Sequence, residues 1–235
     1  MDAPALTCLV RQSFDSEAFG LDYYRAATPD YEALARDLAS LGALRAPFMA
    51  DAKLPAQDIE GSKRLQRLGF RKICVQPTFV LPLAGMRGAA VGEPLAVVDM
   101  PLDELSAHAA NFTYSRFGLD PDVSENERQA HQERWLANSM ASPDILVFRE
   151  QGAFVSFKVR EGVVVIDLVS ALSSSRGRGS LLLERLKAWA AGQGHSRIEV
   201  TTESENIPAC LFYQKNGYRL DRANVAFHLR AQAPA

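Results

Sequence analysis

The sequence lacks the excess of positive charge that is typical of nucleic-acid-binding proteins. Its 26 Lys and Arg residues are balanced by 28 Asp and Glu residues, so the formal net charge is −2 and the pI is about 6.1. Proteins that bind nucleic acid usually carry a basic excess that neutralises phosphates. We therefore expect no nucleic-acid partner, although a local basic patch remains at Arg176 and Arg178.

Cysteines are few, and long apolar runs are missing. Cys8, Cys74 and Cys210 are odd in number and widely spaced, which favours reduced thiols over a disulfide framework, and no pair has zinc-ligand spacing. The N-terminus has no basic start followed by a long apolar run, as a signal peptide would, and no segment approaches about 18 uncharged apolar residues. We therefore expect a cytoplasmic protein with no metal site and no membrane partner.

The chain is long enough for more than one core. It has 235 residues, 47% of them hydrophobic, which suits one large domain or two small ones. Glycine, alanine and proline cluster in the stretch AGMRGAAVGEP at residues 84–94. We therefore predict an N-terminal domain over residues 1–84, a linker over 85–94 and a second domain over 95–235.

The second domain has a well-defined order of predicted elements. Two helices are followed by three strands with Gln-Gly and Glu-Gly connections, a pattern typical of an antiparallel meander. The glycine-containing stretch SSSRGRGS comes next, at residues 173–180. After it we predict a helix, a strand, a short helix and a final strand, at residues 180–194, 197–204, 206–218 and 225–230.

The first domain contains an echo of the second. Residues 65–81 and 212–229 each show a short helix that ends in Gly-aromatic-Arg, and a phenylalanine follows ten residues after each glycine. A helix and a candidate strand precede both segments. We interpret this as an internal repeat. Because the first copy has no counterpart of RGRG, we predict that it is truncated and has lost a binding loop.

A glycine-containing turn between a strand and a helix is a candidate anion site. Backbone N–H groups at a helix N-terminus have no partner within the helix, and the helix dipole adds partial positive charge. Glycine lets the backbone approach a ligand closely, and the two arginines add charge. The alternative is a surface turn with solvated arginines. A nucleotide P-loop is excluded because no Lys-Ser/Thr pair follows, and a dinucleotide fingerprint because the preceding strands form a meander.

The order of these features resembles the GCN5-related N-acetyltransferases (GNAT) over roughly residues 95–230. It comprises a meander ending in IDLV, a loop with R-G-x-G, a helix, a strand, and then N-x-x-A-x-x-x-Y and G-Y. The resemblance implies an α/β (α+β) GNAT fold, with a mixed sheet, splayed central strands and flanking helices, preceded here by a truncated GNAT-like copy. It also implies acetyl-CoA as the cofactor, its pyrophosphate bound by a Gln/Arg-x-x-Gly-x-Gly/Ala loop.

The loop fits that motif in two frames. One frame aligns Arg176 and Gly179 but places Leu181 where a small residue belongs, whereas the other aligns Gly177 and Gly179 and places Ser174 where a long polar side chain is usual. We choose the second frame because it keeps both tight positions small. The resemblance then assigns cofactor binding to the strand and loop residues Leu168, Val169, Ser170, Ser174, Ser175, Arg176, Gly177, Arg178, Gly179 and Ser180, with Asn206 near the thiol end.

Acyl transfer to an amine needs a proton for the leaving thiolate and a path for the proton of the amine. The resemblance makes Tyr213 the proton donor, and Asn206 lies seven residues earlier on the same helix face. The alternatives are a core aromatic for Tyr213 and a helix N-cap for Asn206. Asp167 alternates with Ile166 and Leu168, so it should face away from both. The base is left open among Asp167, Glu203, His131, His228 and a water molecule.

The segment at residues 112–139, together with FDSEAFG and QRLGF, resembles the sugar-nucleotide branch of the family. That branch acetylates amino sugars such as dTDP-fucosamine, a dTDP-4-amino-4,6-dideoxyhexose. The resemblance implies that Arg116 meets a diphosphate and that Tyr114, Phe117 and Trp135 stack on the ligand, unless these aromatics only pack between helices. Another small amine, a peptide N-terminus or a non-catalytic acyl-CoA-binding role are alternatives. The N-terminal copy offers a surface for a homodimer.

Overall fold

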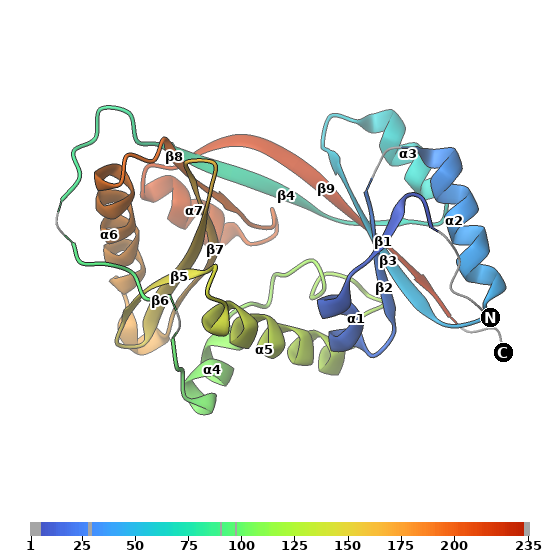
Figure 1. The fold of residues 1–235 in the computed structure, drawn as a ribbon, viewed down its shortest axis with the longest axis horizontal. Helices are drawn as coiled ribbons and strands as arrows, with labels where there is room; N and C mark the ends of the chain where they lie inside the picture. The colour runs from blue at the N-terminus through green and yellow to red at the C-terminus, as the bar shows by residue number, and fades with distance from the viewer. Residues whose placement is uncertain (1–5, 28–29, 90, 97, 233–235) are drawn as a thin grey trace. The chain divides into compact units, whose positions relative to one another are not determined.

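The computed structural model describes residues 6–27, 30–89, 91–96 and 98–232, which form two compact units. The N-terminal unit contains the chain up to Gln76, residues 114–131 and the chain from Ala223 (Figure 1). The C-terminal unit contains residues 77–113 and 132–222. The compact units therefore differ from the predicted domains 1–84 and 95–235, because two later segments of the chain belong to the N-terminal unit.

The N-terminal unit is built on a mixed sheet with the strand order β1-β2-β3-β9. The β2 and β3 strands are parallel, while β1 and β9 run antiparallel to their neighbours. Leu34, Leu41 and Leu65 of its helices pack in one core with Phe227 of β9. The elements are β1 (Leu9–Arg11), α1 (Ser13–Phe19), β2 (Asp22–Ala26), α2 (Tyr31–Ala43), β3 (Phe48–Pro55), α3 (Ile59–Arg67) and the last part of β9 (Arg219–Ala231).

The C-terminal unit has the strand order β4-β8-β7-β6-β5, and its β5, β6 and β7 strands form the predicted antiparallel meander. Glu161 and Gly162 both have positive φ, 50° and 75°, as a tight hairpin turn requires. The elements are β4 (Arg71–Pro82), α4 (Leu102–Ala109), α5 (Glu125–Ala141), β5 (Leu146–Glu150), β6 (Ala153–Arg160), β7 (Val163–Ala171), α6 (Arg178–Gly192), β8 (Arg197–Thr201) and α7 (Ile207–Lys215).

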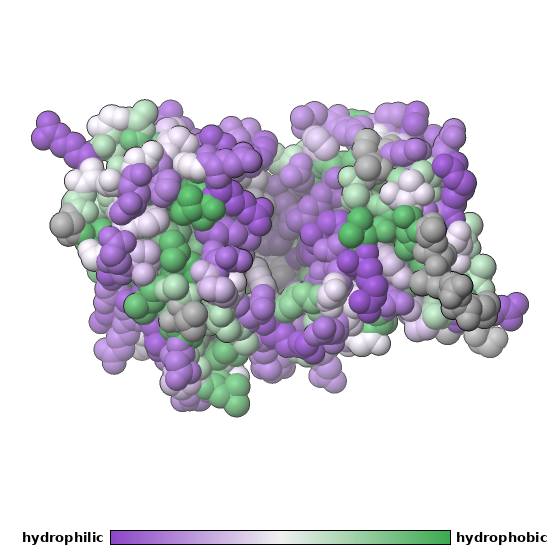
Figure 2. All heavy atoms as spheres, in the orientation of Figure 1, coloured by the Kyte–Doolittle hydropathy of each residue, from purple (hydrophilic) through white to green (hydrophobic). Residues whose placement is uncertain are grey.

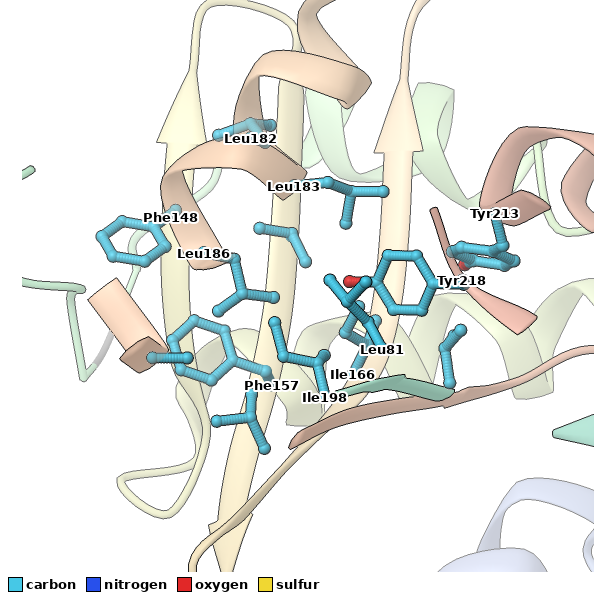
Figure 3. Packing of buried hydrophobic residues seen from close by; sticks show 14 of the residues in the cluster. Leu81, Phe148, Phe157, Ile166, Leu182, Leu183, Leu186, Ile198, Tyr213 and Tyr218 are labelled. Carbon is cyan, nitrogen blue, oxygen red and sulfur yellow. The ribbon is translucent and has the colours of Figure 1, made fainter. Parts of the chain in front are cut away.

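Alternate side chains of this sheet enter two different cores. Phe148 packs in a cluster with Leu182 and Leu186 of α6 and Tyr213 of α7, as Figure 3 shows. Its neighbour Val147 packs in a separate cluster, which contains residues of α4 and α5. Because adjacent strand residues point to opposite faces, α6 and α7 cover one face of the sheet and α4 and α5 cover the other.

The internal repeat is visible in the element boundaries. The α3 helix begins at Ile59 and ends at Arg67, and α7 begins at Ile207 and ends at Lys215, so both ends are 148 residues apart. A glycine with positive φ follows each helix, at 91° for Gly69 and 88° for Gly217, which are also 148 residues apart. The same offset relates β4 to β9, and α2 to α6 within one residue at each end. These matches support the repeat.

The two copies exchange their final strands. The last strand of the first copy, β4, pairs with β8, and the last strand of the second copy, β9, pairs with β3. A Cβ atom on Gly69 would lie 3.5 Å from Leu229, and one on Gly217 would lie 3.6 Å from Leu81. Leu81 and Leu229 are themselves 148 residues apart, so the contacts are equivalent. The exchange explains why the compact units do not follow the order of the chain.

No helix among the described residues is long and apolar enough to cross a membrane. Hydrophilic side chains cover much of the face drawn in Figure 2, and the apolar residues on it form separate patches.

Candidate active site

The β7 and β8 strands separate before β7 ends. Their parallel pairing runs from Val163 opposite Arg197 to Ile166 opposite Val200. The β8 strand ends at Thr201, whereas β7 continues to Ala171 and stays paired with β6. Residues 167–171 therefore have one edge that no described strand covers, and an extended ligand with amide groups can hydrogen-bond there.

A β-bulge at Asp167 changes the alternation in β7. Ser156 of β6 pairs with Leu168 and the adjacent Phe157 pairs with Ile166, so Asp167 is the extra residue. Ile166 consequently packs in the α6 core, but Leu168 packs in the α4 and α5 core. The expectation that Asp167 faces away from both neighbours is wrong. Its carboxylate accepts a hydrogen bond from Ser139 of α5, on the same side as Leu168.

The loop after β7 is folded back by its own hydrogen bonds. Residues 173–175 form a single 3₁₀ turn, in which the Ser175 N–H donates to Leu172 O. The Ser175 side chain is buried, and its hydroxyl donates to Gln151 O over 2.9 Å. Ser175, predicted to bind the cofactor, therefore has its N–H and its hydroxyl proton committed to the loop itself. Ser174 and Arg176 are exposed on either side of it.

Both glycines of the second frame have a physical role. Gly177 is the N-cap of α6 and adopts the left-handed conformation with φ 84°, which other residues adopt at a cost. Gly179 is buried, and a Cβ atom there would lie 3.3 Å from the Phe212 ring of α7. These conformations favour the frame with Gly177 and Gly179 over the frame with Leu181, since Leu181 is 67% exposed and is not confined by packing.

The N-terminus of α6 keeps its hydrogen-bond donors available. Among the described residues, no side chain caps this helix, and the first N–H bonded within it is that of Leu181, to Gly177 O. The N–H groups of Arg178, Gly179 and Ser180 therefore point out of the helix start, as at anion-binding helix N-termini.

In the first copy the equivalent donors are already used. The Asp30 carboxylate caps α2 by accepting from the N–H groups of Glu32 and Ala33. The bulky Tyr31 stands 148 residues before Gly179. A carboxylate at this position repels a phosphate and occupies the groups that would bind it, so the first copy has lost this anion site.

Replacing Gly177 with alanine is expected to strain the loop. A left-handed conformation costs a non-glycine residue about 1–2 kcal/mol, so the free energy of unfolding should fall by that amount and acetyl-CoA should bind more weakly. Urea unfolding and calorimetric titration measure both effects. Gly192→Ala is the matched control, because Gly192 lies at the other end of α6 and an added Cβ there would make only an ordinary contact of 3.7 Å. Equal losses in both variants would contradict the assignment.

Basic side chains flank the loop, and their pairing differs. Arg178 lies 3.7 Å from Glu150, and Arg185, one turn and a half further along α6, lies 3.6 Å from the same carboxylate. The guanidinium of Arg185 also stacks on the Phe148 ring. Arg176 makes no ion pair with a described residue. The loop can therefore offer charge to a phosphate through Arg176, while Arg178 would have to leave Glu150.

Tyr213 lies inside the α6 and α7 core rather than on the surface. It is 6% exposed, and its ring contacts those of Phe79, Phe212 and Tyr218 (Figure 3). Burial raises the pKa of the Tyr213 hydroxyl well above its usual value, and the nearby Cys210 and Glu203 raise it further. The hydroxyl is therefore protonated at neutral pH and can act only as a donor of its proton or as a hydrogen-bond partner.

Asn206 is the N-cap of α7. Its side-chain oxygen accepts a hydrogen bond of 3.2 Å from the N–H of Ala209. Asp58 occupies the equivalent position in the first copy and caps α3 in the same way, through Gly61. Capping therefore accounts for the Asn206 oxygen, and its amide nitrogen is the group left for a ligand.

Two of the candidate bases are committed to the core of the N-terminal unit. His131 hydrogen-bonds Asp15 over 3.0 Å, and His228 hydrogen-bonds Asp120 over 2.6 Å. Both rings also pack against Phe117. These contacts give both histidines a structural role. Glu203 lies just beyond β8, where its carbonyl oxygen accepts from the N–H of Asn206.

The environment predicted for Arg116 is wrong. We expected an exposed loop residue, but the Arg116 side chain is only 13% exposed and pairs with Asp51, which is 1% exposed. The pKa of the Asp51 carboxyl is held below its ordinary value, because Arg116 and Arg25 outweigh the opposing effect of burial. Tyr23 lies close enough to Arg116 to interact electrostatically with it. The guanidinium is thus part of a buried charge cluster.

The three predicted substrate-binding aromatics have different surroundings. Phe117 is 3% exposed and belongs to a buried cluster with Phe19 and Tyr23. Trp135 packs against Phe112 in the α4 and α5 core. Tyr114 is 40% exposed. Packing therefore accounts for Phe117 and for much of Trp135, and Tyr114 is the aromatic with a free face.

One polar cluster beside β7 has no signature in the sequence. Ser170, predicted to act through its backbone, also uses its hydroxyl: the oxygen lies 2.8 Å from His108 Nδ1 and 3.1 Å from Asn111 Nδ2. These residues come from segments about sixty positions apart in the chain. No spacing rule could have joined them, and only the packing of α4 against β7 does.

Comparison with known proteins agrees with this geometry. Residues 111–218 match the model of the acetyltransferase (GNAT) family. A relative is the uncharacterized protein YxbD of Bacillus subtilis (strain 168), 32% identical over 71 residues. That match spans 30% of this chain and 45% of the relative, so the chain covers less than half of the length of YxbD.

Three solved structures share the fold. A GCN5-related N-acetyltransferase from Sphaerobacter thermophilus has a TM-score of 0.54 at 13% identity, over 94% of this chain and 75% of its own. One from Kribbella flavida has 0.53 at 18%, over 96% and 88%. A tandem GNAT protein from the clavulanic acid biosynthesis pathway has 0.53 at 12%, over 91% and 76%. At such identities the likeness concerns the fold, and the predicted mixed α/β architecture is confirmed.

Proposed function

Because residues 111–218 belong to the GNAT acetyltransferase family, we propose that the protein transfers the acetyl group of acetyl-CoA to a primary amine. The separation of β7 from β8 supports this most, since the open edge leads directly to the uncapped N-terminus of α6. A pantetheine arm carries amide groups that suit the first feature, and a pyrophosphate suits the second. The residues proposed to bind it lie along 168–170 and 174–180.

The acyl donor supplies a thioester, and the chain supplies the groups that handle protons. Tyr213 is proposed to protonate the leaving thiolate, because its buried hydroxyl keeps its proton at neutral pH. Asn206 is proposed to hold the thiol end through its free amide nitrogen. Asp167, exposed in part at the bulge, is proposed to contact the acceptor side together with Ser139.

For the acceptor we propose the amino group of a nucleotide-linked amino-deoxy sugar, with a dTDP-4-amino-4,6-dideoxyhexose as the first compound to test. The proposal rests on the sequence resemblance of residues 112–139, in which Tyr114 keeps an exposed ring for stacking. Arg116 does not serve as a diphosphate ligand while it is paired with Asp51.

The burial of Arg116 and Phe117 favours a second candidate, a smaller amine or a peptide N-terminus. A nucleotide diphosphate needs cationic partners, and the one predicted for it is engaged. The two candidates can be separated by measuring CoA release from acetyl-CoA with dTDP-, UDP- and GDP-linked amino sugars, simple amines and short peptides. Release with an amino sugar nucleotide alone supports the first candidate, and release with small amines alone supports the second. Binding of acetyl-CoA without release for any amine would indicate a non-catalytic module.

A further inference from the structure

The Ser170 hydroxyl is the centre of a directed hydrogen-bond chain. Ser170 lies on the part of β7 that β8 does not cover, and its side chain is buried against α4. The Asn111 amide can only donate to it, over 3.1 Å. Because Asn111 supplies a hydrogen to the oxygen, the hydroxyl proton of Ser170 is free to point at His108 Nδ1, 2.8 Å away.

This arrangement fixes the state of His108. A hydroxyl that donates to Nδ1 needs a lone pair there, so neutral His108 carries its proton on Nε2. Nε2 lies 3.7 Å from a carboxylate oxygen of Glu104, one turn earlier on α4. In the neutral ring Nε2 makes no hydrogen bond with a described residue. A second proton on the ring would turn this contact into an ion pair.

The surroundings of His108 balance one another. The ring is completely buried and packs edge-on against Phe154 of β6. Burial lowers the pKa of His108, Glu104 raises it, and Arg149 of β5 lowers it, so that the pKa lies below its ordinary value. Arg149 in turn donates to Glu104 over 2.5 Å. His108 is therefore neutral at physiological pH and able to accept a proton.

We propose that His108, acting through the Ser170 hydroxyl, receives the proton that the acceptor amine loses during acyl transfer. The inference rests on the proposed function. As the nitrogen–carbon bond forms and the carbon–sulfur bond breaks, the amine proton passes to the Ser170 oxygen and the Ser170 proton passes to His108 Nδ1. The thiolate takes its proton from Tyr213. Asn111, which is exposed, marks the way by which the proton then returns to solvent.

The proposal predicts a pH profile that follows His108. Protonated His108 cannot accept, so kcat/KM for the amine falls as the pH drops through the pKa of this ring. His108→Gln should lower kcat/KM by at least about 100-fold and remove that acid limb, while acetyl-CoA binding is kept. Ser170→Ala should behave alike, and Ser170→Thr, which keeps a hydroxyl, should restore turnover. His195→Gln is the control, since His195 lies beyond α6 against Trp189.

Two further variants should move the acid limb in opposite directions. Glu104→Gln removes a group that raises the pKa of His108 and should shift the limb to lower pH. Arg149→Gln removes a group that lowers it and should shift the limb to higher pH. These shifts do not depend on the stability of the His108 variant. A limb that persists in His108→Gln, or that both variants leave in place, would overturn the relay.

Nitrogen NMR of the imidazole tests the relay without turnover. The proposal requires the neutral ring to carry its proton on Nε2, with a pKa below that of a free histidine, and the Ser170→Ala variant to alter the Nδ1 signal. A proton on Nδ1 would make His108 a donor to Ser170 and would exclude the proposal. If no amino sugar is acetylated but another amine is, the acceptor proposal fails, while the pH profile with that amine still decides the relay.

Discussion

Tyr213→Phe is expected to lower kcat by about 100-fold or more, while acetyl-CoA binds as before. General-acid groups contribute about 10²–10⁴ in rate, because an unprotonated thiolate is a poor leaving group. The substitution removes only the hydroxyl, and the ring keeps its contacts with Phe79 and Tyr218 in the core. Steady-state kinetics and calorimetric titration of acetyl-CoA separate the chemical step from binding.

Tyr218→Phe is the matched control for this experiment. Tyr218 belongs to the same core cluster, is 2% exposed, and its hydroxyl has no hydrogen-bond partner among the described residues. Removing an unpaired buried hydroxyl should leave the rate unchanged and the fold at least as stable. Full turnover in Tyr213→Phe would remove Tyr213 from the mechanism, and an equal loss in both variants would indicate a packing effect.

Arg116→Met is expected to lower the free energy of unfolding by about 3–5 kcal/mol, because removal of one partner strands a buried charge. Asp51 would keep only Arg25, whose side chain is 44% exposed and less able to compensate. Urea unfolding measures the loss. Adding Asp51→Leu should recover most of it, since a buried ion pair can be replaced by apolar side chains at little net cost.

Arg11→Met provides the comparison for this charge cluster. Arg11 pairs with Asp22 on the surface of the same unit, and both side chains are about half exposed. Such pairs contribute little, so stability should hardly change. The result that would contradict the structure is an Arg116→Met variant as stable as the parent but with a raised KM for a nucleotide-linked acceptor, as an exposed diphosphate ligand would give.

Local patterns carried the prediction of the fold a long way. The meander, the helix after the loop and the repeated Gly-aromatic-Arg ends follow from spacing and turn chemistry within short segments, and the structure has all of them. The pairing of β3 with β9 and of β4 with β8 does not follow from any such pattern. Each copy alone predicts that its strands pair with one another, and the exchange is decided by contacts between distant segments.

The candidate site shows the same limit. Gly177 and Gly179 could be chosen in the loop because a tight turn demands small residues. The alternation VVVIDLV conceals the bulge at Asp167, because an extra residue in a strand leaves no mark on its composition. Arg116 looked exposed in a polar segment, yet its partner Asp51 lies 65 positions away and draws it inside. Ser170 and His108 are likewise joined only by tertiary packing.

The central claim is that the second copy binds acetyl-CoA at the N-terminus of α6 and that the first copy does not. Calorimetric titration of the whole protein with acetyl-CoA tests it most directly. One molecule should bind per chain, more weakly in Gly177→Ala and unchanged in Asp30→Gly, because Asp30 fills the equivalent position with its own carboxylate. Two sites per chain, or binding that is indifferent to Gly177→Ala, would contradict the account.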